Sequence, residues 1–188
     1  MVGLIAEEKH ITTSHFKETG DTVILIGGLG SELGASHYLK VVHGKKAGIV
    51  PRLDFAREIA MQKALLALIQ AGLVKSAHDC SEGGLAVALA ESTISGDAFI
   101  GAEIDLGDTP LRLDQLLFNE SQGRVVISTA AENAGAVLAS LSTAGVPAQV
   151  IGKTIAEELQ ISANGAKISW PVAQLHETWY CFHLSLHD

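Results

Sequence analysis

The sequence has little charge, little cysteine and no long apolar run. Only 18% of its 188 residues are charged and 47% are hydrophobic, a balance that excludes a disordered chain and supplies a core. Lysine and arginine number 13 against 21 aspartates and glutamates, a net charge of −8. This charge argues against the basic surface that nucleic-acid binding requires. No run of 18 apolar residues exists, so no membrane span is expected.

The cysteines and the N-terminus favour a reducing compartment. Cys80 and Cys181 are too few for a secreted disulfide scaffold, and they do not form a C-x-x-C metal spacing. The first ten residues, MVGLIAEEKH, lack both the basic region and the long apolar region of a secretory signal. We therefore expect a cytoplasmic protein.

Alternating strand and helix patterns predict a single α/β domain with a mixed β-sheet flanked by helices. Residues 27–51 hold six glycines and are expected to form a long loop with one short helical turn. Strands are predicted at 2–6, 22–26, 73–79, 99–106, 123–130 and 146–155, with a hairpin at 159–170 turning at Asn164-Gly165. Helices are predicted at 53–71, 83–95, 109–121, 131–145 and 172–180, with Pro110 in a first turn.

The two strands predicted first, VGLIA and TVILI, have few polar neighbours to cover them. Large exposed apolar patches favour association. We therefore expect an apolar face that makes the chain a homodimer or dependent on a partner.

The stretch SAHDCSEGGLAVALAES places polar residues directly before an apolar helix. A helix N-terminus offers backbone N–H donors to an anion, and Gly83 and Gly84 would let a phosphate approach them. Ser81 is a candidate N-cap, and Asp79 is a candidate ligand for Mg²⁺, which one carboxylate can share with phosphates. On local pattern alone, a capped helix with packing glycines is an equally good interpretation. His78 is expected to be a hydrogen-bonded core residue.

The same stretch closely resembles the signature H-D-x-S-[DE]-G-G-L-x-x-x-L-x-E of C-terminal domains in the aminoimidazole ribonucleotide (AIR) synthetase superfamily. HITTSHFKETGDTVILIG, SELGASHYLKVVHG and LLFNESQGRVVIS further resemble the phosphoribosylformylglycinamidine synthase family. The resemblance runs from about Val2 to Ile151. Residues 152–188 match less distinctly and are assigned to the same domain, 1–188.

The resemblance implies the second of two C-terminal domains in an ATP-dependent C–N ligase of purine biosynthesis. That family converts formylglycinamide ribonucleotide, ATP and glutamine-derived ammonia into formylglycinamidine ribonucleotide, ADP and phosphate. The implied partners are the ATP-binding N-terminal half and, in the small form of the enzyme, a glutaminase and a small accessory subunit. The chain alone is expected to be inactive. The alternatives are a sister enzyme (AIR synthetase, selenophosphate synthetase or thiamine-monophosphate kinase) and a non-catalytic nucleotide-binding module.

The resemblance also implies roles for individual residues. Asp79 would hold Mg²⁺ and Ser81 an auxiliary ATP or ADP, with Gly83 and Gly84 beside the phosphates. No catalytic residue is implied.

The counterpart of a substrate-contacting E-S-Q motif is Glu120, Ser121 and Gln122. The alternative for these residues is a helix-to-strand corner in which Glu120 pairs with Arg124.

A second glycine-rich stretch, GGLGSELG at 27–34, lacks the lysine of a phosphate-binding Walker A loop. It is expected either to line a cleft or to turn the chain.

Overall fold

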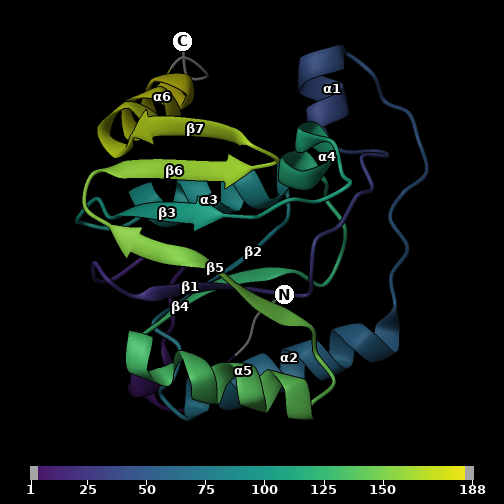
Figure 1. The fold of residues 1–188 in the computed structure, drawn as a ribbon. Coiled ribbons are helices and arrows are strands. Elements are labelled where there is room, and N and C mark those ends of the chain that lie inside the picture. The colour runs from purple at the N-terminus through teal and green to yellow at the C-terminus, as the bar shows by residue number, and fades with distance from the viewer. Residues whose placement is uncertain (1–3, 185–188) are drawn as a thin grey trace.

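One mixed sheet forms the middle of the molecule (Figure 1). A computed structural model describes residues 4–184, and in that range seven strands lie in the order β2-β4-β1-β5-β3-β6-β7. Neighbouring strands are antiparallel except β3 and β6, which are parallel. The strands are β1 (Thr22–Ile26), β2 (Ser76–Asp79), β3 (Gly101–Asp105), β4 (Val125–Thr129), β5 (Ala148–Ile155), β6 (Glu158–Ala163) and β7 (Ala166–Pro171).

Helices cover both faces of this sheet. Figure 1 shows α2 and α5 together on one side, whereas α3, α4 and α6 lie on the other. None of the helices within residues 4–184 is long and apolar enough to cross a bilayer. The helices are α1 (His37–His43), α2 (Phe55–Gln70), α3 (Gly84–Ile94), α4 (Leu113–Phe118), α5 (Ala134–Thr143) and α6 (Val172–Leu184), with 3-10 turns at Glu8–His10 and Ala131–Asn133.

The central strand β1 explains why TVILI is apolar at every position but the first. Because side chains alternate between the faces of a strand, Val23 and Leu25 pack with α3 and α4, whereas Ile24 and Ile26 pack with α2 and α5. All four side chains are fully buried. The expectation that this strand forms an exposed apolar face is therefore wrong.

Exposed apolar side chains gather instead on α1, on the first turns of α2 and on the segment between them. That segment runs down one side of the molecule, away from the sheet (Figure 1). Its exposed residues with those of the adjoining helices are Val41, Val42, Ile49, Val50, Leu53, Phe55 and Ile59. Leu4 and Ile5 are also exposed, and residues 4–6 form no strand, so the strand expected at 2–6 is wrong there. Residues 2 and 3 lie outside the described chain.

The β6–β7 hairpin has the predicted turn, since Asn164 and Gly165 both have positive φ angles, of 51° and 74°. Asn164 also explains why the helix expected at 109–121 begins only at Leu113. Its side chain accepts from the N–H of Thr109 at 2.7 Å and donates to the carbonyl of Leu111 at 2.9 Å. These bonds hold residues 109–111, with Pro110, as a loop before α4.

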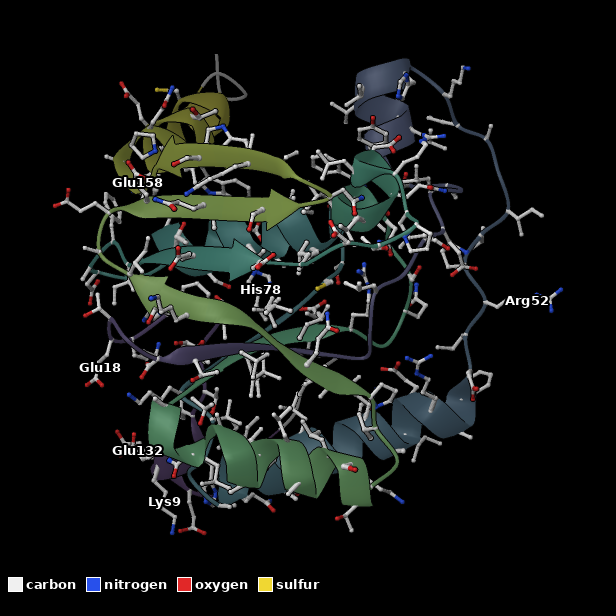
Figure 2. The ribbon with its side chains drawn as sticks, viewed as in Figure 1. Lys9, Glu18, Arg52, His78, Glu132 and Glu158 are labelled. Atoms are coloured by element: carbon white, nitrogen blue, oxygen red, sulfur yellow. The ribbon has the colours of Figure 1, made fainter. Side chains whose placement is uncertain are left out.

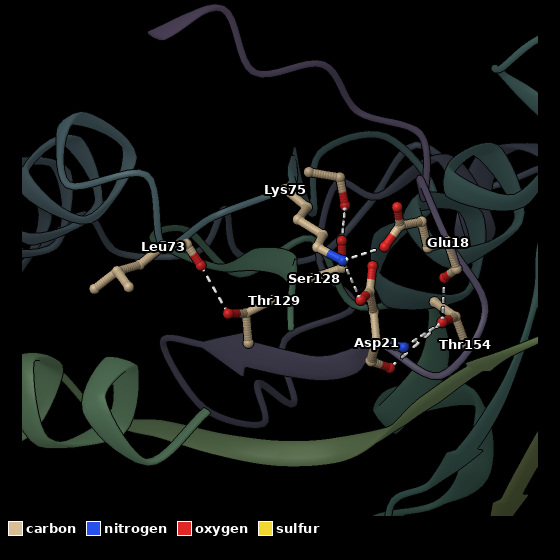
Figure 3. A network of polar contacts seen from close by, with 8 residues as sticks. Glu18, Asp21, Leu73, Lys75, Ser128, Thr129 and Thr154 are labelled. Carbon is tan, nitrogen blue, oxygen red and sulfur yellow. Dashed lines mark hydrogen bonds and ion pairs between the residues drawn. The ribbon is translucent and has the colours of Figure 1, made fainter. Parts of the chain in front are cut away.

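A partly buried polar network joins three parts of the sheet (Figure 3). Lys75, just before β2, donates to the carboxylates of Glu18 and Asp21, each at 2.6 Å. Thr154 on β5 accepts from the N–H of Asp21 at 2.9 Å and donates to the carbonyl of Glu18 at 2.6 Å. The hydrogen bond to Asp21, followed by that to Glu18, raises the pKa of Lys75. The network fixes the segment that leads into β1.

Candidate functional site

The pairing of β2 with β4 brings the two sequence motifs together. These strands are antiparallel with Asp79 opposite Val125, and the N–H of Cys80 donates to the carbonyl of Arg124 at 2.9 Å. The residues after β2 therefore lie beside those before β4, although about 40 positions separate them in sequence. A cleft of about 360 Å³ lies at this junction, and we call it the motif cleft. It is lined by His37, Glu58, Met61, residues 79–82, Glu120 and residues 122–125.

Glu120 is the residue that organises the motif cleft. Its Oε1 accepts from the backbone N–H of Gly83 at 2.9 Å and from that of His37 at 2.8 Å. Gly83 precedes the first residue of α3, and His37 is the first residue of α1. One carboxylate therefore accepts hydrogen bonds at two helix N-termini, where negative charge is stabilising. At α1 it adds to the cap made by Ser36, whose hydroxyl accepts from the N–H of Leu39.

This arrangement corrects two expectations. Ser81 is not the N-cap of α3, because Gly83 holds that position with a φ of 76° and the hydroxyl of Ser81 donates to the carboxylate of Asp79. Glu120 does not pair with Arg124, which instead donates to the carbonyls of Asn119 and Ser121 at 2.5 and 3.2 Å.

The glycines of the signature serve close packing. A Cβ at Gly84 would lie 2.3 Å from the carbonyl oxygen of Asn119, and one at Gly83 would lie 2.3 Å from Val87 Cγ2. Their N–H groups are not uncovered as expected, since Gly83 donates to Glu120 and Gly84 to the carbonyl of Ser81 at 3.0 Å.

Asp79 and Ser81 form the exposed side of the motif cleft. The side chain of Asp79 is 70% exposed, so its carboxylate is open to solvent and to a ligand. In the described chain, no group of three or more His, Cys, Asp or Glu side chains is placed to hold a metal ion. The side chains present fit a magnesium ion only if it is shared between Asp79 and the phosphates of a nucleotide.

His78 is hydrogen-bonded, as expected, but it is only partly buried, since 18% of its side chain is exposed. Figure 2 shows it in the middle of the molecule. Its Nε2 lies 2.8 Å from a carboxylate oxygen of Glu91 on α3, and this bond raises the pKa of His78 although burial opposes the shift. Burial raises the pKa of the neighbouring Cys80 to about 11, so its thiol is not an activated nucleophile.

The other two residues of the E-S-Q motif, Ser121 and Gln122, differ in burial. Ser121 is buried, and its hydroxyl donates to a carboxylate oxygen of Glu32 at 3.1 Å. Gln122 is exposed on the cleft wall. Sequence reasoning missed His37 and Glu58 as cleft residues, because no local pattern marks either of them.

A comparison with known protein families identifies the family of this chain. The profile described as AIR synthase related protein, C-terminal domain, matches residues 18–163, more than half of the chain. The chain belongs to this family. The matched residues include the signature before α3 and the strands β1 to β6.

Curated relatives of this family member are bacterial enzymes. The chain is 42% identical over 180 residues to the phosphoribosylformylglycinamidine synthase subunit PurL of Alkaliphilus metalliredigens, covering 95% of the chain and 24% of that protein. It is 44% identical over 165 residues to PurL of Moorella thermoacetica, covering 88% of the chain and 22% of that protein. These similarities confirm the resemblance to the synthase family. The chain spans about a quarter of the length of these relatives.

Solved structures share the fold. A Thermotoga maritima PurL complexed with FGAR matches with a TM-score of 0.74 and 23% identity, covering 90% of the chain and 30% of that protein. Escherichia coli HypE, a hydrogenase maturation protein, matches with a TM-score of 0.61 and 21% identity, covering 86% of the chain and 52% of that protein.

Proposed function

We propose that the chain is the C-terminal lobe of a phosphoribosylformylglycinamidine synthase, acting in the cytoplasm in purine biosynthesis. It would support an ATP-dependent ligase whose ATP-binding half lies outside these residues. The relatives favour this enzyme over its sister enzymes, because the curated proteins compared above are both PurL subunits. In this proposal the lobe is the second C-terminal copy and is inactive alone. The motif cleft offers no activated nucleophile.

We further propose that the motif cleft holds an auxiliary Mg²⁺-nucleotide, ATP or ADP. The observation that carries this proposal is the exposed pair of Asp79 and Ser81 beside the N-terminus of α3. Asp79 would share the metal with the phosphates, and Ser81 would contact a phosphate oxygen. The N–H of Gly83 donates to Glu120, so it can bind a phosphate oxygen only if that oxygen replaces the Glu120 carboxylate as its acceptor. Gly84 would then act through close packing alone.

The proposed partners follow from the same assignment. The exposed apolar side chains around α1 and the start of α2 are the surface that an ATP-binding half would cover. A Thermotoga maritima PurLQS structure matches this fold with a TM-score of 0.70 and 21% identity. A glutaminase and a small accessory subunit are therefore part of the proposal, and without them the same surface would favour a homodimer.

The Asp79→Asn substitution tests the nucleotide site. It removes the charge and keeps the shape, so Mg²⁺-ADP affinity should fall at least ~10-fold, which corresponds to about 1.4 kcal/mol. Glu82→Gln is the matched control, since Glu82 is an exposed carboxylate on the same cleft. Calorimetric titration measures both variants.

The melting temperatures of Asp79→Asn and Ser81→Ala should stay close to that of the unmodified chain. Both side chains are exposed, and Ser81 caps no helix, so each change should cost at most ~0.5 kcal/mol. Equal Mg²⁺-ADP affinity in Asp79→Asn and in the unmodified chain would refute the nucleotide site.

A further inference from the structure

A second cleft of about 400 Å³ lies next to the motif cleft. It is lined by the glycine-rich residues 27–32, by Arg52 and Arg57, and by Ser121, Gln122 and Arg124. We call it the loop cleft. Only Gln122 and Arg124 line both clefts. The sequence did not decide whether the glycine-rich stretch lines a cleft or only turns the chain. In the structure it lines a cleft.

Two glycines hold the loop against the residues before β4. A Cβ at Gly27 would lie 2.0 Å from the carbonyl oxygen of Gly123, and one at Gly30 would lie 2.3 Å from Oδ1 of Asn119. Only glycine permits these approaches. Within the described chain, the backbone N–H groups of residues 28–31 donate to no other residue. The loop thus supplies several backbone donors at the wall of the cleft.

Arg124 is a buried cation that lacks a counterion. Its residue exposure is 3%, and its Nη1 has no hydrogen-bond partner among the described residues. Its other nitrogens reach only backbone carbonyls, and no described carboxylate forms an ion pair with it. Burying a charged group without a partner is costly, and arginine remains protonated at neutral pH. An anion in the cleft would supply the missing partner.

The other charges around the loop cleft are mainly positive. The guanidinium of Arg57 donates to the carbonyl of Gly27 and so lies against the loop. Arg52 is at the rim and extends outward (Figure 2). Glu32 is the opposing charge, and its carboxylate accepts from Ser121. Three arginines against one glutamate make this a basic site in a chain whose net charge is −8.

We propose that the loop cleft binds the phosphate group of a phosphorylated small molecule. Guanidinium groups and unpaired backbone N–H groups together match the several acceptor oxygens of a phosphate better than the two of a carboxylate. No aromatic side chain lies among the lining residues, so the site recognises the phosphate and not a nucleobase. This inference does not depend on the nucleotide site of the motif cleft.

Calorimetric titration of the 188-residue chain with ribose 5-phosphate, inorganic phosphate and ribose tests the proposal. A chelator removes divalent cations, so that a metal-dependent nucleotide site does not contribute. Ribose 5-phosphate and inorganic phosphate should bind and ribose should not. Arg57→Gln should weaken phosphate binding at least 10-fold. Glu32→Gln should strengthen it several-fold by removing the competing carboxylate, which a merely structural role would not produce.

A control locates the effect. Arg112→Gln removes an exposed guanidinium that pairs with Asp114 outside the loop cleft, and it should bind phosphate like the unmodified chain. Arg124→Lys keeps the charge but loses the planar fork, so it should bind weakly. If this variant does not fold, Arg57→Gln and Glu32→Gln decide the question.

Any one of several results would overturn the inference. They are the absence of phosphate binding by the unmodified chain, unchanged binding in Arg57→Gln, and weaker binding in Glu32→Gln. Equal losses in Asp79→Asn and Arg57→Gln would also overturn it, because they would place the phosphate in the motif cleft. The Mg²⁺-ADP titration of Asp79→Asn is a separate measurement, so either proposal can fail without the other.

Discussion

Removing the carboxylate of Glu120 should destabilise two helix N-termini at once. In Glu120→Ala the N–H groups of Gly83 and His37 lose their common acceptor. Each lost hydrogen bond from a backbone N–H to the carboxylate costs about 1.5 kcal/mol, so the two together correspond to about 3 kcal/mol. For a chain of this length, a loss of about 3 kcal/mol lowers the Tm by roughly 6–12 °C. Glu120→Gln keeps an acceptor oxygen and should lose about half as much.

Thermal melts and amide hydrogen exchange measure this effect. Glu82→Ala is the control, because Glu82 is 80% exposed and lies 3.8 Å from His37 Nε2, so its removal should cost at most ~0.5 kcal/mol. Exchange at the amides of Gly83 and His37 should become faster in Glu120→Ala only. A melt no lower than that of Glu82→Ala, or unchanged exchange at both amides, would refute the double cap.

Two further predictions concern α3. The hydrogen bond to Glu91 raises the pKa of His78 above its ordinary 6.5. The charged form of His78 therefore stabilises the fold fully below about pH 6.5, and this stabilisation is lost as the pH rises through the raised pKa. The stability difference between the unmodified chain and Glu91→Gln, from denaturant unfolding, should therefore be largest near pH 5.5 and shrink towards pH 9; a difference constant with pH would contradict this. Gly84→Ala should cost about 2–4 kcal/mol, because a Cβ would meet the carbonyl of Asn119 and the φ is +66°. Gly135→Ala, in the first turn of α5 where an added Cβ meets no atom within 4 Å, should instead stabilise by at most about 0.5–1 kcal/mol. Equal melting shifts for the two variants would exclude the packing role of Gly84.

Elements with a strong local pattern could be predicted from the sequence. The apolar periodicity of α2, the run of β1 and the Asn164-Gly165 turn each depend on neighbouring residues, and each was predicted at nearly its observed position. The helix predicted to begin at Thr109, with Pro110 in its first turn, begins only at Leu113. The reason is that Asn164, more than 50 residues away, binds residues 109–111 as a loop. That interaction depends on the tertiary fold, which no local pattern encodes.

The sequence predicted several residues of the candidate site but not the hydrogen bonds between them. The signature marked Asp79 and Ser81, and the structure places them with Glu120 and Gln122 on one cleft. The sequence favoured Ser81 as the cap of α3 because serine is the usual residue there. Glu120 takes that role only because β2 and β4 are antiparallel neighbours. The buried Arg124 was missed as a ligand candidate, since its lack of a counterion is visible only in three dimensions.

The strand order also determines when β1 can join the sheet during synthesis. Its partners are β4 and β5. Ile26 therefore cannot pair until Val125, about 100 residues later in the chain, has been synthesised. At translation rates of about 5–20 residues per second, this delay is roughly 5–20 s. During that time TVILI is a short, uncharged segment of β-branched and aliphatic residues with both edges unpaired, which is the kind of segment that aggregates. The strand at the centre of the finished sheet is thus a segment of the nascent chain that a chaperone would protect.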